Sequence, residues 1–121
     1  QRIARRICPN CREEYQPDKT NLDELSAVLG KILPKKKEEI KFFRGKGCEQ
    51  CNNTGYYGRV GIFEVLSVSE KIVKLILERA PAGEIEKQAV EEGMITMLQD
   101  GYLRVVEGVS TMEEVVRVVR D

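Results

Sequence analysis

The chain has 121 residues, a length that suits one ordinary domain with a single hydrophobic core. Hydrophobic residues make up 41% of the composition and charged residues 33%, which excludes a disordered tail. Twenty basic and twenty acidic residues cancel, so the overall charge draws the chain neither to nucleic acid nor to an anionic membrane. No apolar run is long enough to span a bilayer and no signal peptide is visible, so we expect a soluble protein.

The first residues carry no initiator methionine and no helix-start signal. The chain begins with Gln1 and continues "RIARRIC". We therefore expect a piece of a longer polypeptide, with part of its function outside these residues.

The segment of residues 20–33, "TNLDELSAVLGKIL", predicts a helix. Asn21 is the expected N-cap, with Glu24 three residues later, and Pro34 ends the helix. Its apolar positions recur at helical spacing and share one face: Leu22, Leu25, Val28, Leu29, Ile32 and Leu33. The following "KKKEE" is interpreted as a solvated turn in preference to a docking surface.

Two strands are predicted around the middle of the chain. Ile40–Gly47, "IKFFRGKG", leads into a cysteine turn, and the run from Arg59 to Leu66, "RVGIFEVL", follows the turn-rich "NNTGYYG". We expect these two strands to pair with each other in a small ribbon.

From Ser69 onward the pattern is helical and predicts four helices. Ser69 is the expected N-cap of the first, and the second ends at Gly93. The third spans residues 94–108, and the last begins at Ser110 with Glu113 at capping-box spacing. The predicted fold class is α+β: a small zinc-clasped β-ribbon with an inserted helix, followed by a C-terminal bundle of about four helices. We expect subdomains at residues 1–66 and 67–121 within one compact unit.

The four cysteines form two C-x-x-C pairs, "CPNC" and "CEQC". Cys8, Cys11, Cys48 and Cys51 can point four thiolates at one centre, while backbone N–H groups of the turns donate to the sulfur atoms. Closing the loop of residues 12–47 costs about 3 kcal/mol plus a constant. Structural zinc contributes roughly 10–16 kcal/mol, so a zinc site is favoured. Protein fills all four positions, which indicates a structural metal rather than a catalytic one.

Four cysteines in two pairs have uses other than zinc binding. Disulfides suit an even count, but the chain lacks a secretory signal and is large enough to fold without them. A thioredoxin-like pair would need a βαβ pattern, which is absent. The spacing alone does not distinguish zinc from rubredoxin-type iron. Nearby cations would offset the charge of a four-thiolate site: Arg5, Arg6, Arg12, Lys46 and Arg59.

The motifs of a freestanding enzyme are missing. The sequence has no G-x-x-x-x-G-K-[ST] phosphate loop and no histidine, the commonest general base. Its carboxylates lie among lysines on helix faces, where solubility and i,i+4 pairing explain them. We expect no catalytic residue in this chain by itself.

Three stretches together resemble the C-terminal tetracysteine region of secretion ATPases that power type II secretion and type IV pilus assembly: "QRIARRICPNC", "GCEQCNNTGYYGRVGIFEVL" and "GMITMLQDGYLRVVEGVSTMEEVVRVV". The resemblance covers nearly the whole chain and is weakest over residues 13–41. It implies a cytoplasmic homohexameric ATPase, docked on inner-membrane platform proteins. In such a parent, ATP and magnesium bind a motor core that precedes Gln1, and the four cysteines hold zinc. The resemblance does not say whether the parent serves secretion, piliation or DNA uptake.

The resemblance also bears on Arg59, which stands in the pattern "GRVGIFE". In that family this arginine is expected near a subunit boundary and the nucleotide. A salt bridge to Glu64, or compensation of the thiolate charge, explains it equally well.

Two other function classes remain as alternatives at this point. One is a freestanding zinc-ribbon module that binds nucleic acid, suggested only by the basic stretches "RIARRIC" and "LPKKKEE". The other is a rubredoxin-like electron carrier. The preferred hypothesis is that the chain is a structural zinc-binding and interaction module of a secretion or pilus-assembly ATPase.

Overall fold

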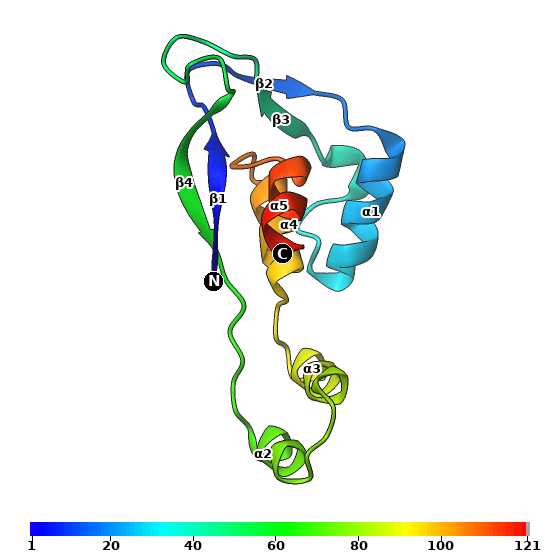
Figure 1. Ribbon diagram of the computed structural model, residues 1–121. Coiled ribbons are helices and arrows are strands. Elements are labelled where there is room, and N and C mark those ends of the chain that lie inside the picture. The colour runs from blue at the N-terminus through cyan, green and yellow to red at the C-terminus, as the bar shows by residue number, and fades with distance from the viewer. Residues whose placement is uncertain (121) are drawn as a thin grey trace. The chain divides into compact units, whose positions relative to one another are not determined.

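The computed structural model describes residues 1–120 (Figure 1). Within these residues, four short strands with one α-helix between the second and third are followed by four more α-helices, which confirms the predicted α+β class. The elements are β1 (Arg2–Ile7), β2 (Arg12–Tyr15), α1 (Lys19–Leu29), β3 (Phe42–Gly45), β4 (Tyr56–Ile62), α2 (Glu70–Leu77), α3 (Ala82–Glu91), α4 (Met97–Val106) and α5 (Met112–Val119).

The strands form two antiparallel ribbons, β1 with β4 and β2 with β3. The expected pairing of Ile40–Gly47 with the strand that begins near Arg59 is therefore wrong. Each of those strands pairs instead with a segment beside "CPNC" to which the sequence assigned no strand. The reason is connectivity: one cysteine turn links β1 to β2 and the other links β3 to β4, so the ribbons meet at the cysteines.

Strand β4 is displaced from its expected range. It begins at Tyr56 and ends at Ile62, not at Leu66. Just beyond its end, the Phe63 N–H donates to Asp100 Oδ2 at 2.9 Å, so a carboxylate of α4 takes the place of a strand partner.

The helix starts are partly as expected. Ser69 caps α2 by accepting a hydrogen bond from the Ile72 N–H at 3.2 Å, which confirms that prediction. The other two expected N-caps are wrong, because α1 follows Asp18 and α5 follows Thr111. Thr111 Oγ1 accepts from the Glu114 N–H at 3.1 Å. Ser110 instead donates to a backbone carbonyl of β1.

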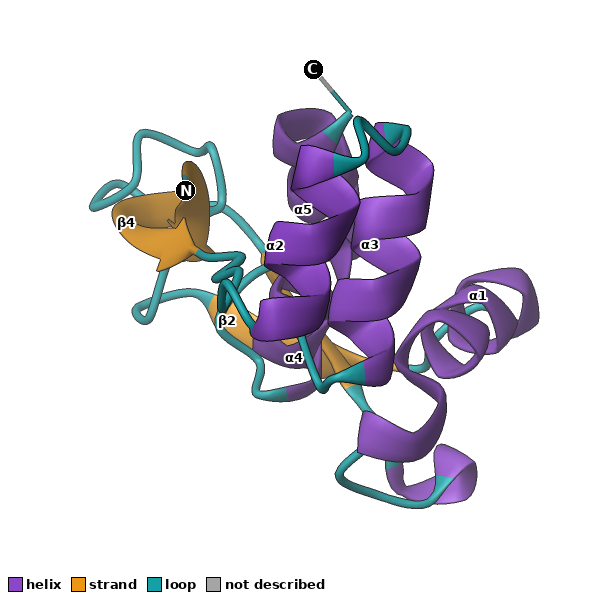
Figure 2. Cartoon of the chain, turned by 90° about the horizontal axis from the view of Figure 1, so that it is seen from below, coloured by secondary structure: helices purple, strands orange, loops and turns teal. Residues whose placement is uncertain are grey.

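The chain divides into two compact units. One holds Gln1–Phe63 and the chain from Met97 onward; the other is Glu64–Thr96. Helices α4 and α5 pack against each other and against the strands, whereas α2 and α3 pack against each other (Figure 2). This grouping differs from the expected subdomains at residues 1–66 and 67–121. That division stays a prediction about domain organisation.

The larger unit has a continuous apolar core. Its fully buried side chains come from α1, β3, β4, α4 and α5, and include Leu25, Phe42, Ile62, Tyr102 and Val115. Gly101 of α4 lies against this core, and a Cβ there would stand 2.4 Å from Val115 Cγ1. The close approach of α4 to α5 therefore depends on glycine at position 101, which has no side chain.

Replacing Gly101 with alanine should lower the free energy of unfolding by about 1–3 kcal/mol, because overpacking outweighs the better helix propensity of alanine. Urea unfolding followed by circular dichroism measures the change. Gly83→Ala is the matched control, since a Cβ at Gly83 meets nothing within 4 Å. A Gly101→Ala variant as stable as this control would contradict the packing argument.

Candidate metal centre

The two cysteine turns are held together by backbone hydrogen bonds. The Cys8 N–H donates to the Gly55 carbonyl at 2.9 Å, and the Lys46 N–H donates to the Cys11 carbonyl at 3.0 Å. The backbones of Gly45 and Gly55 pass so closely that a Cβ on Gly45 would lie 2.0 Å from the Gly55 oxygen. The turn chemistry of the sequence thus brings "CPNC" and "CEQC" to one place.

All four sulfur atoms lie within 4.8 Å of one another. The separations are 3.7 Å for Cys8–Cys48, 3.8 Å for Cys11–Cys51 and 3.6 Å for Cys48–Cys51. The cysteines are free thiols, since a disulfide bond spans only about 2.05 Å. Sulfur atoms that surround zinc tetrahedrally at about 2.3 Å lie about 3.8 Å apart. The residues therefore fit a four-sulfur metal site.

Backbone N–H groups point at the sulfur atoms, as the turn geometry predicts. Gly47 donates to Cys11 Sγ at 3.2 Å. Cys48 and Gly55 both donate to Cys51 Sγ, each at 3.3 Å. These donors favour negative charge on sulfur, which is the state that binds metal.

The thiols do not ionise equally. Burial opposes ionisation of Cys51, but the N–H groups of Gly55 and Cys48 hold its pKa down to about 6. A hydrogen bond from Asn10 lowers the pKa of Cys48. Burial raises the pKa of Cys11 to about 11. The cluster favours some thiolates at neutral pH, and a divalent cation would be needed to ionise all four.

Two of the cations expected near the sulfur atoms make contacts elsewhere. Arg5 pairs with Glu114. Arg12 donates to the Gly108 carbonyl at 3.2 Å, and its guanidinium lies 3.9 Å from the centre of the Phe43 ring. Arg5 therefore connects β1 with α5, and Arg12 connects β2 with the turn that follows α4.

Arg59 lies in the middle of β4, opposite Arg5 in the strand register, with an exposed side chain. It lines a shallow groove of about 590 Å³ together with Ile3 and Phe63. Its expected role at a subunit boundary or near a nucleotide stays a prediction.

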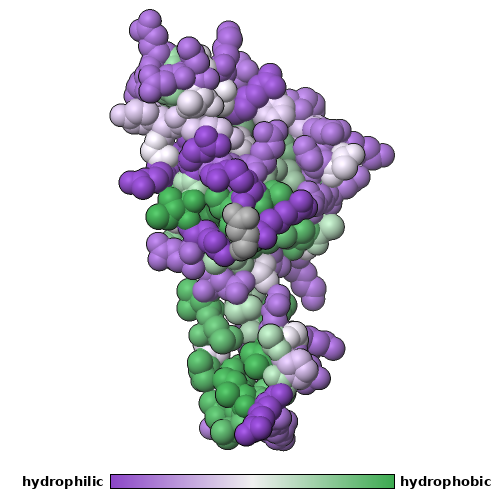
Figure 3. All heavy atoms as spheres, viewed as in Figure 1, coloured by the Kyte–Doolittle hydropathy of each residue, from purple (hydrophilic) through white to green (hydrophobic). Residues whose placement is uncertain are grey.

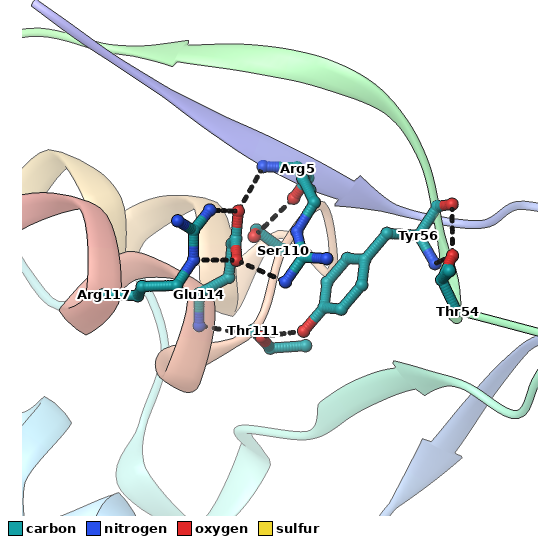
Figure 4. A network of polar contacts seen from close by, with 7 residues as sticks. All are labelled: Arg5, Thr54, Tyr56, Ser110, Thr111, Glu114 and Arg117. Carbon is teal, nitrogen blue, oxygen red and sulfur yellow. Dashed lines mark hydrogen bonds and ion pairs between the residues drawn. The ribbon is translucent and has the colours of Figure 1, made fainter.

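A buried carboxylate beside β1 was missed by the sequence analysis. Glu114 of α5 has a side chain with 0% exposure. Arg117 binds both its oxygen atoms, at 3.0 and 2.7 Å. Arg5 donates to it from the backbone N–H at 2.7 Å and from Nη2 at 3.0 Å (Figure 4). Burial alone would raise the pKa of Glu114, but the hydrogen bonds from Arg117 and Arg5 lower it to about 2.

Further contacts around Glu114 tie the ribbon to the start of α5. Ser110 Oγ donates to the Arg5 carbonyl at 2.8 Å, and the hydroxyl groups of Tyr56 and Thr111 are 2.7 Å apart (Figure 4). The Ile7 N–H, next to Cys8, donates to the Val109 carbonyl at 2.9 Å. The strand that carries the first cysteine turn is thereby fixed to the last helix.

The chain is similar in sequence to known proteins of secretion systems and pilus assembly. Residues 1–117 match the family model described as Type II/IV secretion system protein. The chain is 36% identical over 115 residues to the type IV pilus assembly ATPase PilB of Thermus thermophilus, covering 95% of this chain and 12% of that protein. It is 35% identical over 121 residues to the type II secretion system ATPase E of Vibrio cholerae, covering 100% and 22% respectively.

The fold and the site thus define the class of protein: an α+β module that carries a four-cysteine cluster. The chain belongs to the type II/IV secretion system protein family, which confirms the resemblance seen in the sequence. It spans only 12–22% of the length of the curated relatives named above. Among the described residues, no helix combines the length and apolar character needed to cross a membrane.

The buried carboxylate should make stability depend on pH. Its folded-state pKa of about 2 lies below the usual 4.5, so it stabilises the fold by about 3 kcal/mol at neutral pH. This contribution is present above about pH 5 and is lost as the pH falls toward 2. We expect Glu114→Gln to be less stable at pH 7, and its difference from the wild type to shrink on acidification.

Urea unfolding at a series of pH values measures this difference. Glu107→Gln is the control, because Glu107 forms an exposed pair with Arg104. A pH-independent difference between wild type and Glu114→Gln would contradict the electrostatic account.

Proposed function

We propose that this chain is the structural zinc-binding and interaction module of a hexameric secretion or pilus-assembly ATPase. The observation that carries the proposal is the set of four sulfur atoms within 4.8 Å of one another, contributed by two turns that join four strands. Protein supplies every ligand, so the ion would hold the turns together and leave no position for water or substrate. Cys8, Cys11, Cys48 and Cys51 are the proposed ligands.

The ATPase activity would belong to the parent protein, outside these residues. The named relatives are ATPases of type IV pilus assembly and type II secretion. We infer that the parent binds ATP and magnesium in its motor core and couples hydrolysis to pilus extension or protein export. The module would contact that core, neighbouring subunits of a homohexamer, and platform proteins at the cytoplasmic face of the inner membrane.

Within such an assembly the module would act as a rigid part. The zinc would fix the ribbons at the cysteine turns, while Glu114 and its arginines hold β1 against α5. Force applied to the last helix would thus reach the metal centre through strand β1. Arg59, exposed on β4, is the proposed contact with a neighbouring subunit or its nucleotide.

Freshly purified, reduced protein should contain one zinc ion per chain by elemental analysis. Removing it with a strong chelator should lower the melting temperature sharply, because the metal free energy is folding free energy. A visible absorption band together with stoichiometric iron would show that the site holds a rubredoxin-type iron centre and not zinc. An intact fold without any metal would refute the proposal.

Replacing Cys48 and Cys51 together with serine in the parent ATPase should abolish metal binding, destabilise the module and stop secretion or piliation. Elemental analysis, thermal unfolding and a secretion or piliation assay measure the three effects. Gln50→Ser is the matched control, because Gln50 is exposed in the same turn and is no ligand. Normal function of the double variant would show that the cluster is dispensable.

Arg59→Ala should leave zinc content and thermal stability unchanged, since the side chain is exposed. In the parent it should weaken hexamer formation or reduce the rate of ATP hydrolysis, measured by light scattering and phosphate release. Lys87→Ala, on the exposed face of α3, serves as the control. Wild-type assembly and hydrolysis by Arg59→Ala would leave the arginine without the proposed role.

A further inference from the structure

The unit Glu64–Thr96 has many more exposed large hydrophobic residues than buried ones. Within it, only Ile72 and Ala89 are buried hydrophobic residues among those described. Its exposed large hydrophobic residues are Val65, Leu66, Val68, Val73, Ile76, Leu77, Val90 and Ile95. Figure 3 shows apolar residues gathered over the part of the chain that contains α2. Soluble surfaces rarely leave so much apolar area without a partner.

Helix α2 is apolar over a wide arc of its surface, and only part of this arc is buried. Ile72 and Leu75 are buried or half-buried in the unit that α2 forms with α3. Val73, Ile76 and Leu77 are spaced i, i+3 and i+4, so they form a second stripe, which we call the outer stripe of α2. All three are exposed, and Leu77 is 78% exposed. An apolar arc wider than the face that a helix turns toward its own unit is typical of an element that packs against a further partner.

The outer stripe of α2 needs a binding partner that is present at all times. A unit with so few buried side chains cannot bury enough apolar area to fold by itself. A partner needed for folding has to be present with every copy of the unit, and a segment of the same polypeptide meets this requirement at high effective concentration. The two named relatives are much longer than the part that this chain matches, since the matched part is 12% of one and 22% of the other.

We propose that the outer stripe of α2 docks on the ATPase portion of its own polypeptide. This inference rests on the proposed function, because it requires that the chain be part of a longer ATPase. The contact would be an intramolecular, mainly apolar interface, with Val73, Ile76 and Leu77 at its centre. Lys74 of α2, and Glu78 at the C-cap of this helix, would lie at its polar rim.

Hydrogen exchange of the α2 amides tests the docking. In the full-length ATPase we expect exchange at least about tenfold slower in the wild type than in Leu77→Asp, because docking suppresses local opening. Lys87→Asp, on the exposed side of α3, should exchange like the wild type. Equal exchange in the wild type and Leu77→Asp would overturn the proposal, as would protection that rises with protein concentration.

A photo-reactive benzoylphenylalanine at position 77 identifies what covers the stripe. We expect cross-links to residues outside the 121-residue segment and within the same polypeptide, shown by mixing heavy-nitrogen-labelled and unlabelled subunits. Cross-links to residues 1–63, or to a neighbouring subunit, would overturn the proposal. Zinc content is measured on the same samples, so a metal-free protein with a docked stripe would defeat the zinc proposal alone.

Discussion

Convergence of four thiols on one point is the constraint on which the rest of the molecule depends. Strands β2 and β3 are each four residues long, and two-stranded ribbons of this kind are marginal in water. The cysteine turns connect both ribbons, so a single ion there would organise all four strands at once. The N–H groups of Gly47, Cys48 and Gly55 are already directed at sulfur, which prepares the turns for a charged centre.

A second constraint lies at the other side of β1. Removing the cationic partners of a buried carboxylate costs about 3–5 kcal/mol, because the carboxylate charge stays buried. Glu114 is such a carboxylate, and its contact with Arg5 joins residues 109 positions apart. The cysteine cluster and the carboxylate thus act on the same strand, one at its end and one along its edge. Together they connect the N-terminal ribbon to the last helix.

The sequence predicted the features that depend on local chemistry. The cysteine spacing identified the cluster, Ser69 identified a helix start, and helical periodicity identified the C-terminal helices. The strand pairing was mispredicted because β1 and β2 are rich in charged residues and show weak alternation. Glu114 was missed for a different reason. Its helix shows only an ordinary i,i+3 pair with Arg117, and nothing local indicates a partner at Arg5.

The position of β1 has a further consequence for association between molecules. One edge of this strand pairs with β4, and the other is occupied by the Glu114 carboxylate, the Ser110 hydroxyl and the Val109 carbonyl. Those three groups satisfy the backbone of Arg5 and Ile7 as an adjacent strand would. A free strand edge is a template for fibril growth. Here a helix and its preceding turn close that edge, so β1 offers no backbone donors at Arg5 or Ile7 to a foreign strand.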